Sequence, residues 1–257
     1  MWYQIIKYLK FLYRSTNQHG VHSPFVYDLV TKCFYDKTNY EDYKSIASYR
    51  NELLSNKKKI NVIDLGIGSQ KITSNERSIA EMAKYAGTTF SRAKLLYRIT
   101  NYFKPKQILE LGTSLGIASY SMLKGYTKCK ITTVEGCENI HAFSKYNLLK
   151  NNINNIELIN KSFDSVIKEV NKKSFDLIFF DGNHQKEATL AYFEALLTTI
   201  HNDAVFIFDD IYLTKNMTEA WEEIKSHPKV KVTIDTYYWG FVFFRSEQKK
   251  EHFTIRV

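Results

Sequence analysis

From residue 107 onward, short apolar runs alternate with amphipathic helical patterns along the chain. The runs fall at 107–111, 130–135, 155–159, 175–181, 203–209, 229–236 and 238–245, and helical patterns separate the first six. Strands joined through helices are crossover connections, which predict a parallel sheet. Only a tight turn near Tyr237 separates the last two runs, so the final strand is expected to be antiparallel. The pattern predicts an α/β, Rossmann-like seven-stranded sheet, six strands parallel and one antiparallel, flanked by helices.

The first 104 residues have mostly helical patterns. Ser23 and Pro24 are typical of a helix start and predict a helix to about Lys32. Further helices are expected at 75–85 and 88–103, the last ending before Pro105. We therefore expect a helical N-terminal region at 1–104, on the substrate side, and a cofactor-binding domain at 105–257.

The N-terminal helix predicted at 2–14 is amphipathic. Its apolar stripe consists of Trp2, Ile5, Ile6, Leu9, Leu12 and Tyr13, with Lys7, Lys10 and Arg14 off the stripe. Packing of the stripe on the parent domain is the leading interpretation. A membrane surface or a dimer contact are the alternatives.

Composition sets limits on the class of protein. With 257 residues and 44% hydrophobic content the chain can bury a full core, and no run approaches the ~20 apolar residues that cross a bilayer. Three cysteines without CxxC spacing support neither a disulfide framework nor a zinc site. We expect a cytoplasmic protein. The net charge of +9 permits RNA or another polyanion as a partner, although scattered cations usually form a solvated surface.

The glycine-spaced turn after the run at 107–111 is the first candidate ligand site. Gly112 and Gly116 bracket a turn that leads into a helix, and its amides are expected to face outward toward a polar ligand. Glu135 follows Gly112 by 23 positions and ends the second strand. An acid at about this separation accepts the hydroxyls of a ribose, so Glu135 is predicted to be a ribose contact.

A second stretch of similar appearance, NVIDLGIGSQ at 61–70, is expected to be a loop or short strand outside the main sheet. A helical pattern follows it, and no second strand ending in an acid appears at the required distance. Folding of this stretch over the ligand is an open alternative.

Four motifs in order, ILELGTSLG, TTVEG, FDLIFFDGNH and VFIFDDI, resemble those of class I S-adenosylmethionine-dependent methyltransferases, and are similar to the catechol O-methyltransferase-like group. The resemblance covers about residues 88–245. The segments HGVHSPF and EHFTIRV resemble methyltransferase-like proteins of bacterial origin.

The resemblance implies S-adenosylmethionine as cofactor and assigns roles to residues at the strand ends. The residues implied in cofactor binding are Glu110, Gly112, Thr113, Ser114, Gly116, Glu135, Gly136, Ser162, Phe163, Asp181, Thr88 and Thr89. Among these, Glu135 would hold the ribose, Ser162 and Phe163 would flank the adenine, and Thr88 and Thr89 would close over the cofactor.

The resemblance also implies a divalent metal site at Asp181, Asp209 and Asp210, suited to Mg²⁺ or another divalent cation. Asp210 stands where relatives often have Asn, and the alternative is that Asp209 and Asp210 cap the following helix. His184 stands where relatives carry a Lys that removes the acceptor proton, and an imidazole can perform that step at neutral pH. His184 and Asp181 are therefore the candidate catalytic residues, with a backbone-bonded His184 as the alternative.

The leading hypothesis is an O-methyltransferase that acts on a small or medium acceptor, with metal assistance as a further possibility. An RNA methyltransferase and a non-catalytic cofactor-binding interaction protein are the alternatives. A homo-oligomer is compatible with the sequence. Tyr237, Tyr238 and Trp239 would form a wall of the acceptor pocket or would simply pack.

Overall fold

The computed structural model describes residues 2–64 and 74–257. Its contacts divide the chain into two compact units, Asp36–Val166 and Met1–Tyr35 with Ile167–Val257. These units do not separate at residues 104 and 105, so a domain boundary at that point stays a prediction.

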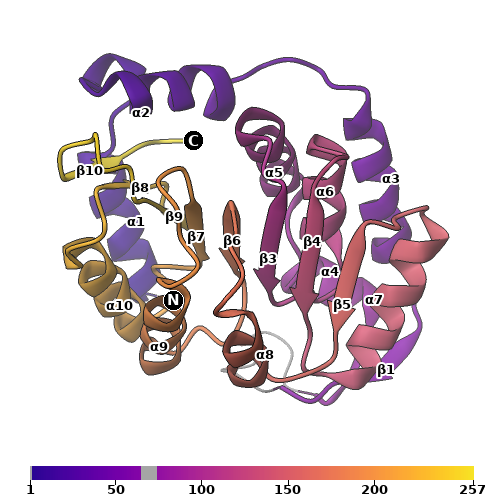
Figure 1. The fold of residues 1–257 in the computed structure, drawn as a ribbon. Coiled ribbons are helices and arrows are strands. Elements are labelled where there is room, and N and C mark those ends of the chain that lie inside the picture. The colour runs from indigo at the N-terminus through magenta and orange to yellow at the C-terminus, as the bar shows by residue number, and fades with distance from the viewer. Residues whose placement is uncertain (1, 65–73) are drawn as a thin grey trace. The chain divides into compact units, whose positions relative to one another are not determined.

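The unit of residues 36–166 contains three parallel strands, with β4 (Lys130–Val134) between β3 (Gln107–Leu111) and β5 (Ile156–Ile159). Its helices are α3 (Asp42–Ser55), α4 (Ile79–Tyr85), α5 (Phe90–Phe103), α6 (Ile117–Gly125) and α7 (Glu138–Lys150). Helices α3, α5 and α6 pack against one another (Figure 1), and α6 is almost completely buried. The turn between β3 and α6 is therefore followed by a helix that is packed and buried along almost its whole length.

The same unit has a small separate sheet of two antiparallel strands, β1 (Lys59–Asn61) and β2 (Glu76–Ser78). Asn61 begins the stretch that was expected to lie outside the main sheet, and its described part does so. Residues 65–70 of that stretch lie outside the described residues. The helix expected at 75–85 begins only at Ile79, because β2 precedes it and Ser78 forms a capping box with Glu81.

The other unit has the strand order β10-β8-β9-β7-β6. Its strands are β6 (Leu177–Phe180), β7 (Val205–Asp209), β8 (Val232–Asp235), β9 (Trp239–Phe243) and β10 (Glu251–Thr254). Strand β9 runs antiparallel to both β7 and β8, as predicted for the final hairpin. Strand β10 was not predicted: it pairs parallel to β8. All seven predicted strands form, and the α/β fold class is confirmed.

Helices of this unit are α1 (Trp2–Arg14), α2 (Pro24–Leu29), α9 (Lys186–Leu196) and α10 (Lys215–Ser226), with short turns η1 (Gln18–Gly20) and η2 (Val30–Phe34). Helix α8 (Phe163–Val170) crosses the boundary between the units. Ser23 accepts a hydrogen bond from the Val26 amide at the start of α2, as its N-cap position predicts. No helix among the described residues is long and apolar enough to cross a bilayer.

Helix α1 corrects the interpretation of its apolar stripe. Trp2, Leu9 and Tyr13 were expected to pack on the parent domain, but their side chains are 77%, 60% and 92% exposed. Phe11, which lies off that stripe, is the buried residue of the helix. The helix has aromatic residues on both sides, so periodicity alone did not identify the side that packs.

Candidate functional site

The turn that follows β3 has an unusual backbone. Gly112, Ser114 and Gly116 all have positive φ, at 111°, 47° and 75°. A Cβ atom at Gly116 would lie 3.0 Å from Leu148 Cδ1 and 3.1 Å from the Tyr49 hydroxyl. Glycine is therefore required at position 116 both by conformation and by space.

The amides of this turn are not directed outward as predicted. Those of Gly112 and Thr113 donate to the Val134 carbonyl at 3.0 and 3.2 Å, and that of Gly116 donates to the Thr113 carbonyl at 2.9 Å. The parallel neighbour β4 ends beside the turn and supplies this acceptor. The amides of Gly112 and Thr113 therefore fix the turn against the end of β4, and the Gly116 amide closes the turn on itself, so none of the three faces a ligand.

Glu135 completes this arrangement. Its Oε2 accepts the Ser114 amide at 3.0 Å, and its Oε1 accepts the Cys137 amide at 2.9 Å. Burial raises the pKa of Glu135, and these two amides partly oppose that shift. The carboxylate is thus oriented from both sides, and each oxygen keeps a lone pair that can accept a ligand hydroxyl.

Glu110 is completely buried at the end of β3. Its Oε2 accepts the hydroxyls of Ser119 and Thr133, the latter at 2.6 Å, while its Oε1 has no partner among the described residues. Burial raises the pKa of Glu110 to about 7, although the two hydroxyls lower it. A buried acceptor without a partner is uncommon and indicates a ligand or water donor that completes it.

Four further residues predicted to bind the cofactor lie at the starts of two helices of this unit, Thr88 and Thr89 at α5 and Ser162 and Phe163 at α8. Thr89 accepts the Arg92 amide at the start of α5, and the Thr88 carbonyl accepts Arg50 Nε at 3.2 Å. Ser162 accepts the Ser165 amide at the start of α8, which leaves the neighbouring Phe163 half-buried. Their contacts with a cofactor stay predictions.

The described part of the stretch at 61–70, which ends at Asp64, lies close to Glu135. Asp64 forms a two-pronged ion pair with the buried Arg77. The Ile63 amide donates to Cys137 Sγ at 3.4 Å, next to Glu135. The Asp64 charge also raises the pKa of Glu135. The described part of this stretch, residues 61–64, therefore lies close to the Glu135 carboxylate, as the alternative that the stretch folds over the ligand requires.

In the other unit, Asp181, His184 and Asp209 form a cluster: one donor atom of each lies within 4.8 Å of the others. Asp181 follows β6, and Asp209 ends the neighbouring parallel strand β7. Asn183 and His184 both have positive φ, at 67° and 50°, so a tight turn brings the imidazole back to the strand ends. Burial lowers the pKa of His184, while the Asp209 carboxylate raises it.

Asp210 is not a member of this cluster, although it was predicted to be a metal ligand. Its φ of 54° marks a sharp change of direction directly after Asp209.

Asp209 is positioned by Trp239, whose indole Nε1 donates to Oδ1 at 2.6 Å. The two residues are register partners on β7 and β9.

The aromatic turn before β9 has mixed roles. Tyr237 packs against Tyr8, Phe11 and Tyr212, and its hydroxyl donates to the Gln4 carbonyl at 2.8 Å. Trp239 is buried, whereas Tyr238 is 51% exposed. Tyr237 and Trp239 thus have packing roles, and the acceptor wall stays a prediction.

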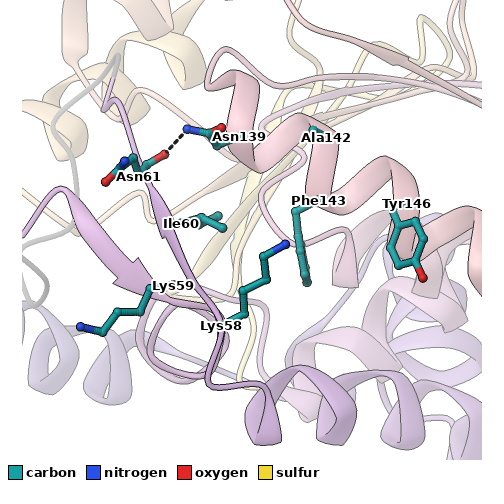
Figure 2. A pocket seen from close by; sticks show the side chains of 8 residues that line it. All are labelled: Lys58, Lys59, Ile60, Asn61, Asn139, Ala142, Phe143 and Tyr146. Carbon is teal, nitrogen blue, oxygen red and sulfur yellow. Dashed lines mark hydrogen bonds between the residues drawn. The ribbon is translucent and has the colours of Figure 1, made fainter.

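A separate hollow of about 410 Å³ lies between β1 and α7 (Figure 2). Its lining residues are Lys58, Lys59, Ile60, Asn61, Asn139, Ala142, Phe143 and Tyr146. The Lys58 ammonium extends toward Phe143, and Asn139 Nδ2 donates to the Asn61 carbonyl at 2.8 Å. Neither Glu135 nor Glu110 lines this hollow.

Sequence reasoning missed several residues that position the candidate groups. Thr133 and Trp239 each sit opposite an acid across a strand pair, Glu110 and Asp209 respectively. These pairs could have been found from the sequence only if the register of the paired strands had been known. Ser119 lies in α6 without a comparable signal.

Comparison with known proteins identifies the domain. Residues 109–211 match a family model described as a methyltransferase domain. No curated protein matches the sequence. The match makes residues 109–211 a methyltransferase domain, and this agrees with the predicted class, a class I S-adenosylmethionine-dependent methyltransferase.

Solved structures share this fold at low sequence identity. An SAH-bound methyltransferase of Podospora anserina, PaMTH1, has a TM-score of 0.63 at 14% identity, over 88% of this chain and 97% of its own. An O-methyltransferase of Bacillus cereus in complex with SAH has a TM-score of 0.55 at 16% identity, over 81% and 92%. The O-methyltransferase TomG of Streptomyces achromogenes, in complex with SAM and involved in tomaymycin synthesis, has a TM-score of 0.56 at 14% identity, over 81% and 92%.

Proposed function

We propose that this chain transfers a methyl group from S-adenosylmethionine to an oxygen atom of a small acceptor. The observation that carries the proposal is the Glu135 carboxylate, which the Ser114 and Cys137 amides hold in one orientation beside a left-handed turn. The solved O-methyltransferases that share the fold, described in complex with SAH or SAM, support the cofactor and the oxygen acceptor.

In this proposal Glu135 accepts the two ribose hydroxyls of the cofactor. Glu110 offers the unpartnered Oε1 as an acceptor for a donor group at the end of β3. The cofactor supplies a methyl group that is already activated on a positively charged sulfur, so the protein's task is alignment and proton removal.

His184 removes the proton from the acceptor hydroxyl. Burial lowers the pKa of His184 and so keeps the free imidazole unprotonated, as a base must be, and the Asp209 carboxylate in the same cluster stabilises the imidazolium that results. Trp239 keeps the Asp209 carboxylate in place through its indole hydrogen bond. Glutamine at position 184 would keep the polarity but could not take the proton.

The donor set also fits a divalent cation. Asp181 and Asp209 supply carboxylate oxygens, and Mg²⁺ commonly binds through one or two carboxylates with water in its other positions. Such a cation would lower the pKa of a hydroxyl bound to it. Asp210 has no place in this set, and His184 keeps its role as the base.

Calorimetric titration with S-adenosylmethionine tests the cofactor site. We expect binding to wild type and at least about tenfold weaker binding to Glu135→Gln, since a carboxylate that accepts two hydroxyls contributes more than ~1.4 kcal/mol. Glu138→Gln is the matched control, because Glu138 is an exposed acid at the start of α7. Undetectable binding to wild type would refute the proposal.

Turnover separates a transferase from a protein that only binds the cofactor. Incubation with a panel of hydroxyl acceptors should release S-adenosylhomocysteine, and His184→Gln should reduce the rate by about 100-fold or more while cofactor affinity stays unchanged. If S-adenosylmethionine binds to wild type but no acceptor in the panel leads to its consumption, the alternative of a non-catalytic interaction protein would be favoured.

RNA is a second candidate acceptor, and the hollow beside α7 favours it. The ammonium groups of Lys58 and Lys59 can contact phosphates there, and the exposed ring of Tyr146 can stack on a base. Binding of bulk tRNA should then weaken steeply with salt and should weaken further in Lys58→Gln. Weak binding that does not respond to salt would remove this candidate.

A further inference from the structure

Helix α1 is attached to its unit by one side only. The Tyr3 hydroxyl donates to Thr218 Oγ1 at 2.7 Å, the Gln4 carbonyl accepts the Tyr237 hydroxyl, and Phe11 is 5% exposed. Residues 3, 4, 7, 8 and 11 follow one another around the packed side at the helical spacing.

The opposite side of α1 is an exposed apolar stripe. At 100° per residue its five members fall within an arc of about 100°, the width of a typical buried helix face. The members, with their exposed fractions, are Trp2 (77%), Ile5 (44%), Ile6 (50%), Leu9 (60%) and Tyr13 (92%). A continuous stripe of this kind marks an interaction surface, unlike isolated apolar residues.

The charge of α1 is entirely positive. Its sequence WYQIIKYLKFLYR contains Lys7, Lys10 and Arg14 and no acid. Lys10 is exposed and lies beside the stripe. Arg14 is also exposed but lies further round the helix, toward the packed side, and Lys7 lies over the rings of Tyr3 and Tyr212. The helix therefore combines an exposed apolar stripe with Lys10 at the edge of the stripe and a second exposed cation, Arg14, in its last turn.

We propose that α1 binds the surface of an anionic lipid membrane, with the stripe inserted among the acyl chains and Lys10 and Arg14 at the headgroups. An exposed apolar face with tryptophan, bordered by lysine and arginine, is the pattern of helices that lie in a membrane interface. This inference is independent of the proposed methyl transfer, because no residue of the stripe belongs to the candidate site.

A second copy of the chain fits this stripe less well. The 13-residue helix is about 20 Å long, and a strip about 10 Å wide would bury roughly 400 Å² over two copies. Stable dimers bury about 1,200 Å² or more, and pairing two such helices would also bring like charges together. A lipid surface buries the same stripe without either difficulty.

Tryptophan fluorescence gives a direct test. Trp2 is the exposed one of three tryptophans, since Trp221 and Trp239 are each 1% exposed. On addition of vesicles of phosphatidylcholine with phosphatidylglycerol, we expect a blue shift of the emission and protection from acrylamide quenching. Vesicles of phosphatidylcholine alone should bind more weakly, and added salt should weaken binding to the anionic vesicles.

Variants connect the binding to the stripe. Ile6→Gln/Leu9→Gln should reduce vesicle partitioning by about tenfold or more, because two inserted apolar side chains are lost. Lys10→Gln/Arg14→Gln should abolish the preference for anionic vesicles. Leu149→Gln is the control, since Leu149 is 50% exposed on α7, and it should bind as wild type does. All of these positions are on the surface, so the fold should tolerate them.

Three results would overturn the proposal. These are no binding of wild type to anionic vesicles, unchanged binding of Ile6→Gln/Leu9→Gln, or equal binding to neutral and anionic vesicles. A dimer in sedimentation velocity that Ile6→Gln/Leu9→Gln dissociates, without any vesicle binding, would assign the stripe to a second copy of the chain.

Discussion

The Ser114 amide donates to the Glu135 carboxylate at 3.0 Å, and this bond joins the turn after β3 to the acid after β4. Ser114 reaches it with a φ of 47°, between two glycines that also have positive φ. The orientation of the proposed ribose contact thus depends on a strained backbone two residues from Gly116.

We predict that Gly116→Ala impairs both stability and cofactor binding. The alanine must adopt a φ of 75°, and its methyl group would lie 3.0 Å from Leu148 Cδ1. The free energy of unfolding should therefore fall by about 1–3 kcal/mol. Chemical denaturation and calorimetry with S-adenosylmethionine measure the two effects.

Ser114→Gly is the matched control for that prediction. It keeps the amide that bonds Glu135 and places glycine at a positive φ, so stability should stay within about 0.5 kcal/mol of wild type. Wild-type behaviour of Gly116→Ala, or equal losses in both variants, would contradict the argument.

Glu110 should make the stability of the cofactor-free protein depend on pH. Its pKa is raised from the ordinary 4.5 to about 7 by burial, so the folded state holds a proton that the unfolded state releases between these values. Stability should therefore decrease as pH rises from about 4.5 to about 7, by an amount on the order of a few kcal/mol.

Glu110→Gln should remove this decrease and should be more stable than wild type above pH 7. The amide can still bond the hydroxyls of Ser119 and Thr133, since each hydroxyl can donate or accept. Denaturant unfolding across this pH range measures the slope. The exposed Glu138→Gln should retain it, and an unchanged slope in Glu110→Gln would count against a raised pKa at this position.

Much of this architecture could be predicted from local sequence. The alternation of strands and helices, and the spacing of Glu135 from Gly112, are properties of short segments and spacings. The structure differs from the prediction where contacts are made by residues distant in sequence. The Val134 carbonyl accepts the turn amides, and Tyr237 packs against one side of α1. A positive φ separates Asp210 from the cluster, and nothing in a DD pair reveals it.

The Trp239 hydrogen bond to Asp209 should contribute measurably to stability. Trp239→Phe removes the indole donor from the buried Asp209 carboxylate, which costs about 1–3 kcal/mol beyond the loss of packing. Trp221→Phe is a close control, because Trp221 is equally buried and its Nε1 has no partner among the described residues. Chemical denaturation should show the larger loss for Trp239→Phe, and equal losses would mean that the bond adds nothing.

Divalent cations should bind through Asp181 and Asp209 and not through Asp210. Mg²⁺ or Mn²⁺ that binds only the folded protein raises the melting temperature, so a thermal shift reports the site without an acceptor. Asp181→Asn and Asp209→Asn should lose the shift because each removes a carboxylate of the cluster, whereas Asp210→Asn should keep it.

His184→Gln should also keep the shift while it loses turnover, since we assign His184 to the proton and the carboxylates to the cation. A shift that disappears in His184→Gln would make the imidazole a ligand, and a shift that disappears only in Asp210→Asn would place the cation outside the cluster.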